Sequence, residues 1–218
     1  MKVTKTKATL VGLVAASAAV GGTFAISSAT AANTSAAAVA TVQTAGELNP
    51  LNNSGVTGAA KVHVRGNRLH VEVKARGLAK KLPHAQHIHF GAQARNECPT
   101  VADDTNGDVR LTTVEGVPGY GPVKVSLTTK GDTSADSVLA VTRYPTADRG
   151  RVDYERTTRT SKNVARAIRN GKGVVVVHGV DYNDNGVYDF DSAGASELNP
   201  DLPAEATDPA TCGVLHTK

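Results

Sequence analysis

The segment from 61 to 74 alternates apolar and polar residues on both sides of a turn signal. Val or Leu occupies every second position, and Gly66-Asn67 between the two halves favours a tight turn. We expect an antiparallel hairpin whose apolar side chains share one buried face, because neighbouring residues of a strand point to opposite faces. That face carries Val62, Val64, Leu69, Val71 and Val73, while His63 and His70 lie on the solvent side.

Shorter segments of the same kind follow along the chain, separated by turn residues such as Pro118-Gly119 and Tyr144-Pro145. Further strands are predicted at 86–90, 123–128, 138–143, 153–158 and 174–178. A single short helix is predicted at 162–169, before Asn170-Gly171. Many short strands joined by turns are typical of β-sandwiches and barrels, so we predict an all-β domain over residues 56–218.

The first 31 residues have the pattern of an export signal. Three lysines precede an apolar stretch of small residues, and Ala29-Thr30-Ala31 places small residues at the positions that signal peptidase requires. We expect cleavage between Ala31 and Ala32, which would make the protein secreted and extracytoplasmic. Residues 32–55 are rich in Ala, Thr, Ser and Asn, and we expect them to form a flexible leader.

Removal of the predicted signal lowers the formal net charge from +4 to +1, because residues 1–31 contain three lysines and no acidic residue. So small a charge argues against a nucleic-acid partner. No other apolar stretch approaches the ~20 residues needed to cross a bilayer, so we expect no membrane span in the mature chain. The physiological partner is not indicated; components of the envelope or cell wall are candidates.

The chain has two cysteines, Cys98 and Cys212. In an oxidising compartment two cysteines most simply form one disulfide. A crosslink that closes so long a loop contributes roughly 4–5 kcal/mol in the chain-entropy model. We therefore expect a single Cys98–Cys212 disulfide.

Histidines supply the candidate metal ligands. His87 and His89 are two residues apart on a predicted strand, so both imidazoles leave the same face. His178 ends the apolar run 174–177 on another predicted strand. Three imidazole nitrogens are a ligand set that suits copper or zinc. Hydrogen-bonded histidines at a strand end, without a metal, are the alternative.

The order of these residues resembles a known family. His84-Ala-Gln-His87-Ile-His89-Phe90-Gly91, followed by Cys98, resembles the copper-site strand of Cu/Zn superoxide dismutases. The strand ending in His178 and the segment around Cys212 resemble later strands of that family. The resemblance implies a Greek-key β-sandwich or barrel with long loops, copper ligands at His87, His89 and His178, and a supporting role for His84 behind them.

The segment Ala85-Gln-His-Ile-His89 also resembles the signature of chordin-type (CHRD) domains, which are secreted β-sandwich modules similar to the dismutase fold. Two departures favour the CHRD side. No histidine lies between His89 and His178, so the bridging ligand and the zinc site that the dismutase resemblance implies are absent and zinc is not expected. No arginine follows Arg169, so the arginine that would guide superoxide is missing as well.

Two acidic loops match parts of the EF-hand calcium pattern, which has oxygen ligands at positions 1, 3 and 5, Gly at 6 and a carboxylate at 12. The first loop has Val109 at position 6, where a β-branched residue is costly if φ is positive. Its candidate calcium ligands are Asp104, Asn106, Asp108 and Glu115.

The second loop has Gly186 at the sixth position but Ser192 at the twelfth, so its carboxylate would come from an aspartate nearby. Its candidate calcium ligands are Asp181, Asn183, Asn185, Asp189 and Asp191. Solvated Asn/Asp/Gly turns are the alternative interpretation of both loops.

Three functions follow from these features. The first is a secreted CHRD/dismutase-like module that binds copper or calcium, or acts structurally, without efficient catalysis. The second is a copper-only superoxide dismutase that uses His87, His89 and His178. The third is an extracytoplasmic copper carrier, which needs affinity for the metal but no redox cycling.

Overall fold

A computed structural model describes residues 39–218. The predicted signal peptide, its cleavage site between Ala31 and Ala32, and the first part of the predicted leader lie outside these residues. No helix in the described range combines the length and the apolar character that a membrane crossing requires.

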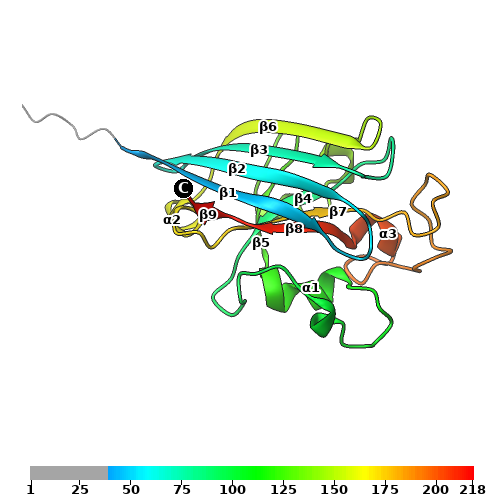
Figure 1. The fold of residues 1–218 in the computed structure, drawn as a ribbon. Coiled ribbons are helices and arrows are strands. Elements are labelled where there is room, and N and C mark those ends of the chain that lie inside the picture. Colours follow the sequence, from blue (N-terminus) through cyan, green and yellow to red (C-terminus); the bar gives the residue numbers. More distant parts are fainter. Residues whose placement is uncertain (1–38) are drawn as a thin grey trace, which may run out of the picture. The chain divides into compact units, whose positions relative to one another are not determined.

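The domain is built on one curled antiparallel sheet of nine strands, in the order β5-β4-β7-β8-β1-β2-β3-β6, with β9 beside β1 (Figure 1). This confirms the all-β prediction. The strands are β1 (Thr41–Pro50), β2 (Thr57–Arg65), β3 (Arg68–Arg76), β4 (Gln86–His89), β5 (Val123–Ser126), β6 (Arg151–Arg159), β7 (Val174–His178), β8 (Pro209–Val214) and β9 (His216–Thr217). The helices are α1 (Thr113–Tyr120), α2 (Lys162–Arg169) and α3 (Ala204–Thr207).

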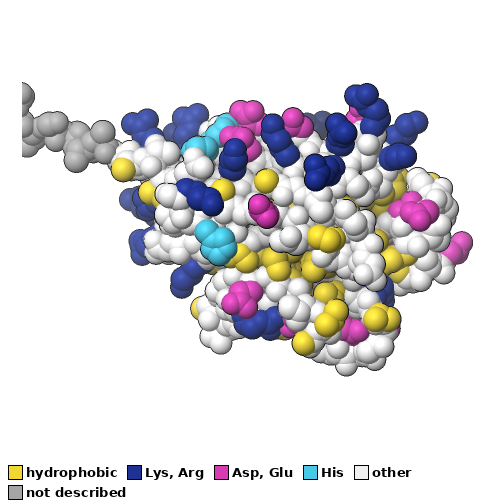
Figure 2. All heavy atoms as spheres, viewed as in Figure 1, with side chains coloured by type: hydrophobic (Ala, Val, Ile, Leu, Met, Phe, Trp, Pro, Cys, Tyr) yellow, Lys and Arg dark blue, Asp and Glu magenta, His cyan; other side chains and the backbone are white. Residues whose placement is uncertain are grey.

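The predicted hairpin is confirmed as β2 and β3. Their register runs from Thr57 opposite Arg76 to Arg65 opposite Arg68, which leaves only Gly66-Asn67 in the turn. The five apolar residues predicted to face the core are all fully buried. Charged residues cover the opposite face: Figure 2 shows Lys and Arg side chains gathered where Figure 1 places β2, β3 and β6.

The prediction of a flexible leader up to residue 55 is wrong for residues 41–50, which form β1. This strand pairs with β2 over most of its length and with β8 at its end, so it joins the two halves of the sheet. The crossing requires glycine, since a Cβ on Gly46 would lie 2.1 Å from the carbonyl oxygen of Val214. Without strong alternation in its sequence, β1 depends on contacts made by distant residues.

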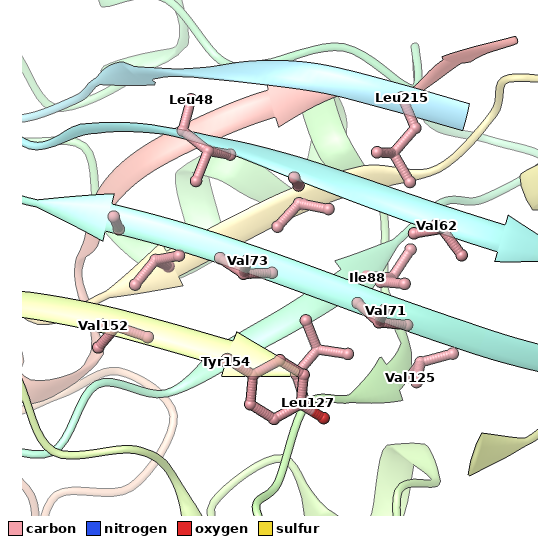
Figure 3. Close-up of a cluster of buried hydrophobic side chains, with 14 of the residues drawn as sticks. Leu48, Val62, Val71, Val73, Ile88, Val125, Leu127, Val152, Tyr154 and Leu215 are labelled. Carbon is pink, nitrogen blue, oxygen red and sulfur yellow. The ribbon is translucent and has the colours of Figure 1, made fainter. Parts of the chain in front are cut away.

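The main core fills the concave side of the curled sheet. Val71 and Val73 of β3 face Ile88 of β4 and Val125 of β5, with Tyr154 of β6 closing one edge (Figure 3). The strands β4 and β7 are buried on both faces. This explains the uninterrupted valines of 174–177, because a strand covered on both sides has no polar face.

A second, smaller cluster packs on the outer face of β7 and β8. Val174, Val176 and the disulfide-bonded Cys212 lie there against Tyr120 at the end of α1. The predicted disulfide between Cys98 and Cys212 is present and spans 114 residues of sequence. It attaches the segment that leads into α1 to the strand β8.

The prediction of a single helix is incomplete. Helix α2 has the predicted bounds, but α1 and α3 were missed. Helix α1 contains Gly116, Pro118 and Gly119, which disfavour a helix in the sequence. A capping box starts it: the Thr112 hydroxyl accepts the N–H of Glu115, whose carboxylate accepts the N–H of Thr112. Burial of Tyr120 then holds the helix against the sheet.

The predicted strand at 138–143 is also wrong. This segment follows the short 3-10 helix Ala135–Ser137, ends in a second one, Val141–Arg143, and pairs with no strand. Its apolar residues do not alternate, and Val138, Leu139 and Val141 instead line a cavity near the histidines. These residues are apolar because they form part of the cavity wall beside His87 and His89 of β4.

We predict that replacing Cys98 and Cys212 together by Ala lowers the free energy of unfolding by about 2–5 kcal/mol, because the crosslink restricts a long loop of the unfolded chain. Urea unfolding of the variant and of the oxidised wild type measures the difference. Reduction of the wild type with a thiol is the control and should give a similar loss. An unchanged midpoint in both experiments would contradict the prediction.

Candidate metal centre

The paired strands β4 and β7 bring three histidines together. In their antiparallel register His87 lies opposite Val176, and His89 opposite Val174. Ile88 enters the main core, so the alternation of the strand places His87 and His89 on the outer face. The same alternation places His178 on that face at the end of β7. The predicted trio is therefore assembled by strand pairing.

The geometry of the trio suits a single metal ion. One nitrogen from each of His87, His89 and His178 lies within 4.8 Å of the others. The ring centroids are 5.1 Å apart for His87 and His178, and 5.5 Å apart for His87 and His89. The prediction that these three side chains meet is confirmed, and the identity of the metal is left open by the geometry.

The second nitrogen of each ring is held by an oxygen atom. The contacts are His87 Nε2 to the Tyr144 hydroxyl at 2.8 Å, His89 Nδ1 to the Gly121 carbonyl at 2.8 Å, and His178 Nδ1 to the Thr207 carbonyl at 2.6 Å. The Tyr144 hydroxyl itself donates to the Ser137 carbonyl, so it accepts the proton of His87. These partners fix the tautomers and leave the other nitrogen of each ring as a lone pair.

Those remaining nitrogens, His87 Nδ1, His89 Nε2 and His178 Nε2, are buried and have no hydrogen-bond partner. The three residues are only 2–3% exposed. Burial lowers the pKa of His89 to about 3 and that of His178 to about 4, and it lowers the pKa of His87 well below its ordinary range. The imidazoles are therefore neutral at pH 7, the form in which histidine binds metals.

A small, mostly apolar cavity of about 40 Å³ adjoins the trio. Its cover comes from the segment 138–144 and from the loop that leads into α3, with side chains such as Leu139, Leu198 and Leu202. None of the residues that line it is Lys, Arg, Asp or Glu. The guiding arginine, expected to be missing, is thus not replaced at the cavity by another cation.

Two tyrosines at this centre were not predicted from the sequence. The ring of Tyr120 packs 4.5 Å from that of His89, and Tyr144 bonds to His87. Tyr144 stands beside Pro145 and suggested only a turn. Its role depends on a contact between residues 57 positions apart, for which the local sequence has no signal.

His84, expected to support the site, is fully buried behind it. Its Nδ1 lies 2.8 Å from the carbonyl oxygen of His178 and its Nε2 lies 3.0 Å from that of Ala79. Burial lowers the pKa of His84, against the effect of the two carbonyls. The ring thus contacts the backbone of a candidate ligand.

The first acidic loop folds around its own side chains. The Asp104 carboxylate accepts the N–H groups of Gly107 and Val109, while Asn106 and Asp108 each accept an N–H two residues further on. Val109 has a φ of +65°, so the sixth position does adopt the conformation expected to be costly for valine. Glu115 caps α1 and bonds to Thr105, which lowers its pKa to about 2 although burial opposes the shift.

The second acidic loop repeats this pattern. Asp181 accepts the N–H groups of Asn185 and Gly186. The side-chain oxygens of Asn183 and Asn185 each accept the N–H group two residues further on, as those of Asn106 and Asp108 do in the first loop. Asp189 and Asp191, the other candidate ligands, lie in the same loop, where Asp189 accepts the N–H of Asp191. The fully buried Glu205, which the sequence did not single out, accepts the N–H groups of Tyr182 and Asp189. Calcium binding by either loop stays a prediction.

Comparison with known proteins adds no relative: no family model matches the chain, and a search of curated proteins finds no significant match. Functional inference therefore depends on the site itself.

We predict that the metal-free protein loses stability as the pH falls from about 6.5 to 4. In this range histidines of the unfolded chain bind protons and the buried ones do not, so acid favours unfolding. The contribution of His178 is on the order of 3 kcal/mol. Urea unfolding at several pH values should show a shallower dependence for His178→Gln than for the half-exposed control His63→Gln. Equal slopes for both variants would refute the prediction.

We predict that Val109→Gly raises the free energy of unfolding by about 0.5–1 kcal/mol, because glycine tolerates a positive φ that costs valine more. Little packing is lost, since Val109 is 84% exposed. The control is Val187→Gly in the second loop, where φ is not positive. The midpoint of thermal unfolding should rise for Val109→Gly and fall for Val187→Gly. A lower midpoint for Val109→Gly would contradict the predicted backbone strain at Val109.

Proposed function

We propose that this protein is a secreted, CHRD/dismutase-like β-domain that binds copper through His87, His89 and His178. The observation that supports it most is the set of three buried imidazole nitrogens that lack partners and converge on one point. A buried polar atom without a partner is costly, so such a set is best explained by a ligand that pairs with all three. The disulfide is typical of exported proteins and supports the proposed location.

Copper is the proposed metal because imidazole nitrogens suit it, and because His84 to Gly91 resembles the copper-site strand of the dismutases. The residues fit it: each ring nitrogen opposite the free lone pair is held by an oxygen, an arrangement that orients the ligand and makes it more basic. When bound, copper would supply a one-electron redox centre. The chain's own contribution is to hold three neutral donors in place and to keep water away from them.

The surroundings of the trio favour holding the metal over rapid catalysis. The cavity is small, and no cationic side chain lines it to attract an anion such as superoxide. A binding module or a copper carrier is therefore preferred to a copper-only superoxide dismutase. Envelope or wall components are the proposed environment.

Calcium binding at the acidic loops is a second candidate function. It is favoured by the hydrogen-bond pattern that the loops at 104–115 and 181–192 share, with a positive φ at the sixth position of each. In both loops backbone N–H groups hold the Asp and Asn side chains on the inside of the turn. Millimolar extracellular calcium would suffice for weak sites of this kind.

We predict that the secreted chain, purified with its disulfide formed and incubated with copper, retains one copper ion per molecule after gel filtration. The double variant His87→Ala/His89→Ala should lose it, because two of the three donors are removed. The matched control is His63→Ala/His70→Ala, which removes a half-exposed pair of histidines on the opposite side of the sheet from the core and should retain the metal. For each protein, mass spectrometry measures the copper content and X-ray absorption measures whether nitrogen atoms ligate the copper.

Equal copper content in wild type and the His87→Ala/His89→Ala variant would refute the proposal. A superoxide-decay assay on the loaded protein then separates the functions. We expect little acceleration over unloaded protein. Rapid dismutation that is lost in the double variant would favour the copper-only dismutase instead.

A further inference from the structure

The cavity beside the three histidines lacks any group that balances positive charge. Its walls are mostly aliphatic, with Leu139, Val141, Leu198, Leu202 and Ala206 among them, and no carboxylate, thiolate or cysteine lines it. The candidate ligands are themselves neutral imidazoles. A metal ion bound here would therefore keep its full charge in an apolar environment.

Two buried carboxylates adjoin lining residues in the sequence, but neither lines the cavity: Glu205 precedes Ala206, and Asp208 follows Thr207. Glu205 accepts the N–H groups of Tyr182 and Asp189. The carboxylate of Asp208 is 2.9 Å from the guanidinium of Arg110 and accepts the Tyr182 hydroxyl. Both carboxylates are thus already engaged by protein groups outside the cavity wall.

Four hydroxyl groups lie in the cavity wall. Three of them donate their protons to other protein oxygens: Thr113 to the Thr207 carbonyl, Tyr144 to the Ser137 carbonyl, and Thr207 to the Ser196 hydroxyl. The fourth, that of Tyr188, lies 3.2 Å from Nδ1 of the buried His84. Water or hydroxide bound to a metal here would have no carboxylate in the cavity wall to receive its proton.

We propose that this site selects Cu(I) over Zn(II) and Cu(II), because the uncharged, mostly apolar cavity wall penalises a second positive charge and offers no carboxylate to a fourth, water ligand. This inference rests on the proposed copper-binding function and specifies its cargo. The cost of moving an ion out of water rises with the square of its charge, so a divalent ion loses far more than a monovalent one. Cu(I) needs no more than the three nitrogens that the chain supplies.

Selection here differs from selection by soft ligands. Thiolates and thioethers select Cu(I) through their chemistry, whereas imidazole accepts both copper states and zinc. The discrimination must therefore come from what surrounds the nitrogens. It follows that altering the cavity wall, with all three histidines intact, should change which ion is preferred.

The experiment measures the affinity of the secreted, disulfide-bonded protein for each ion under identical conditions. Cu(I) is titrated anaerobically against a chromophoric Cu(I) chelator, and Zn(II) and Cu(II) against chelators of their own. We expect Cu(I) to bind at least about a hundredfold more tightly than Zn(II), and the bound Cu(II)/Cu(I) couple to be displaced towards Cu(I) by about 59 mV for each tenfold preference.

A pair of variants tests the cause. Leu139→Asp places a carboxylate at the cavity wall. Leu139→Asn is the control, because asparagine is nearly equal in size to aspartate but carries no charge. We expect Leu139→Asp to reduce the ratio of Cu(I) to Zn(II) affinity by about tenfold relative to Leu139→Asn. Circular dichroism confirms that both variants are folded; if they are not, the wild-type ratio alone decides.

The outcomes are distinct. Tight Cu(I) binding with weak Zn(II) and Cu(II) binding supports the inference. Zn(II) or Cu(II) binding as tight as that of Cu(I), lost in His87→Ala/His89→Ala, overturns the inference and leaves the metal-binding function standing. No binding of any of the three ions overturns both.

Discussion

The pairing of β4 with β7 is the interaction on which the candidate centre depends. It joins segments about ninety residues apart in sequence and places Ile88, Val175 and Val177 in the main core. The apolar side chains fix the register, since a slip of one residue would exchange the two faces. The same register carries the histidines to the outer face. Hydrophobic burial on one side of the sheet thus determines ligand geometry on the other.

Burial of the outer face imposes a second requirement, because each imidazole has two nitrogens and little water reaches them. Loops supply the oxygens: Gly121 follows α1, Tyr144 follows the 3-10 segment, and Thr207 ends α3. The disulfide contributes indirectly. It fixes the segment that leads into α1, and α1 presents both the Tyr120 ring and the Gly121 carbonyl to His89. The disulfide therefore contributes both to the stability of the fold and to the orientation of His89.

Sequence reasoning succeeded where a signal is local. Alternation predicted β2 and β3, a turn signal predicted their junction, and the two-residue spacing of His87 and His89 predicted a shared face. It failed where structure depends on distant contacts: β1 lacks a pattern of its own, and residues 138–143 are apolar because they cover a cavity. Helix α1 did carry a signal, the Thr112–Glu115 capping box, but Glu115 was interpreted as a calcium ligand instead.

One long segment both orients the histidines and determines the surroundings of their free nitrogens. The stretch between His89 and His178, which has no histidine, supplies α1, the Tyr144 hydroxyl and the apolar cover at Val138, Leu139 and Val141. Its Gly121 carbonyl and Tyr144 hydroxyl hold His89 and His87, while its aliphatic side chains bring no charge to the cavity wall. Ligand orientation and the exclusion of charge therefore come from the same part of the chain, and the proposed preference for a monovalent ion requires both.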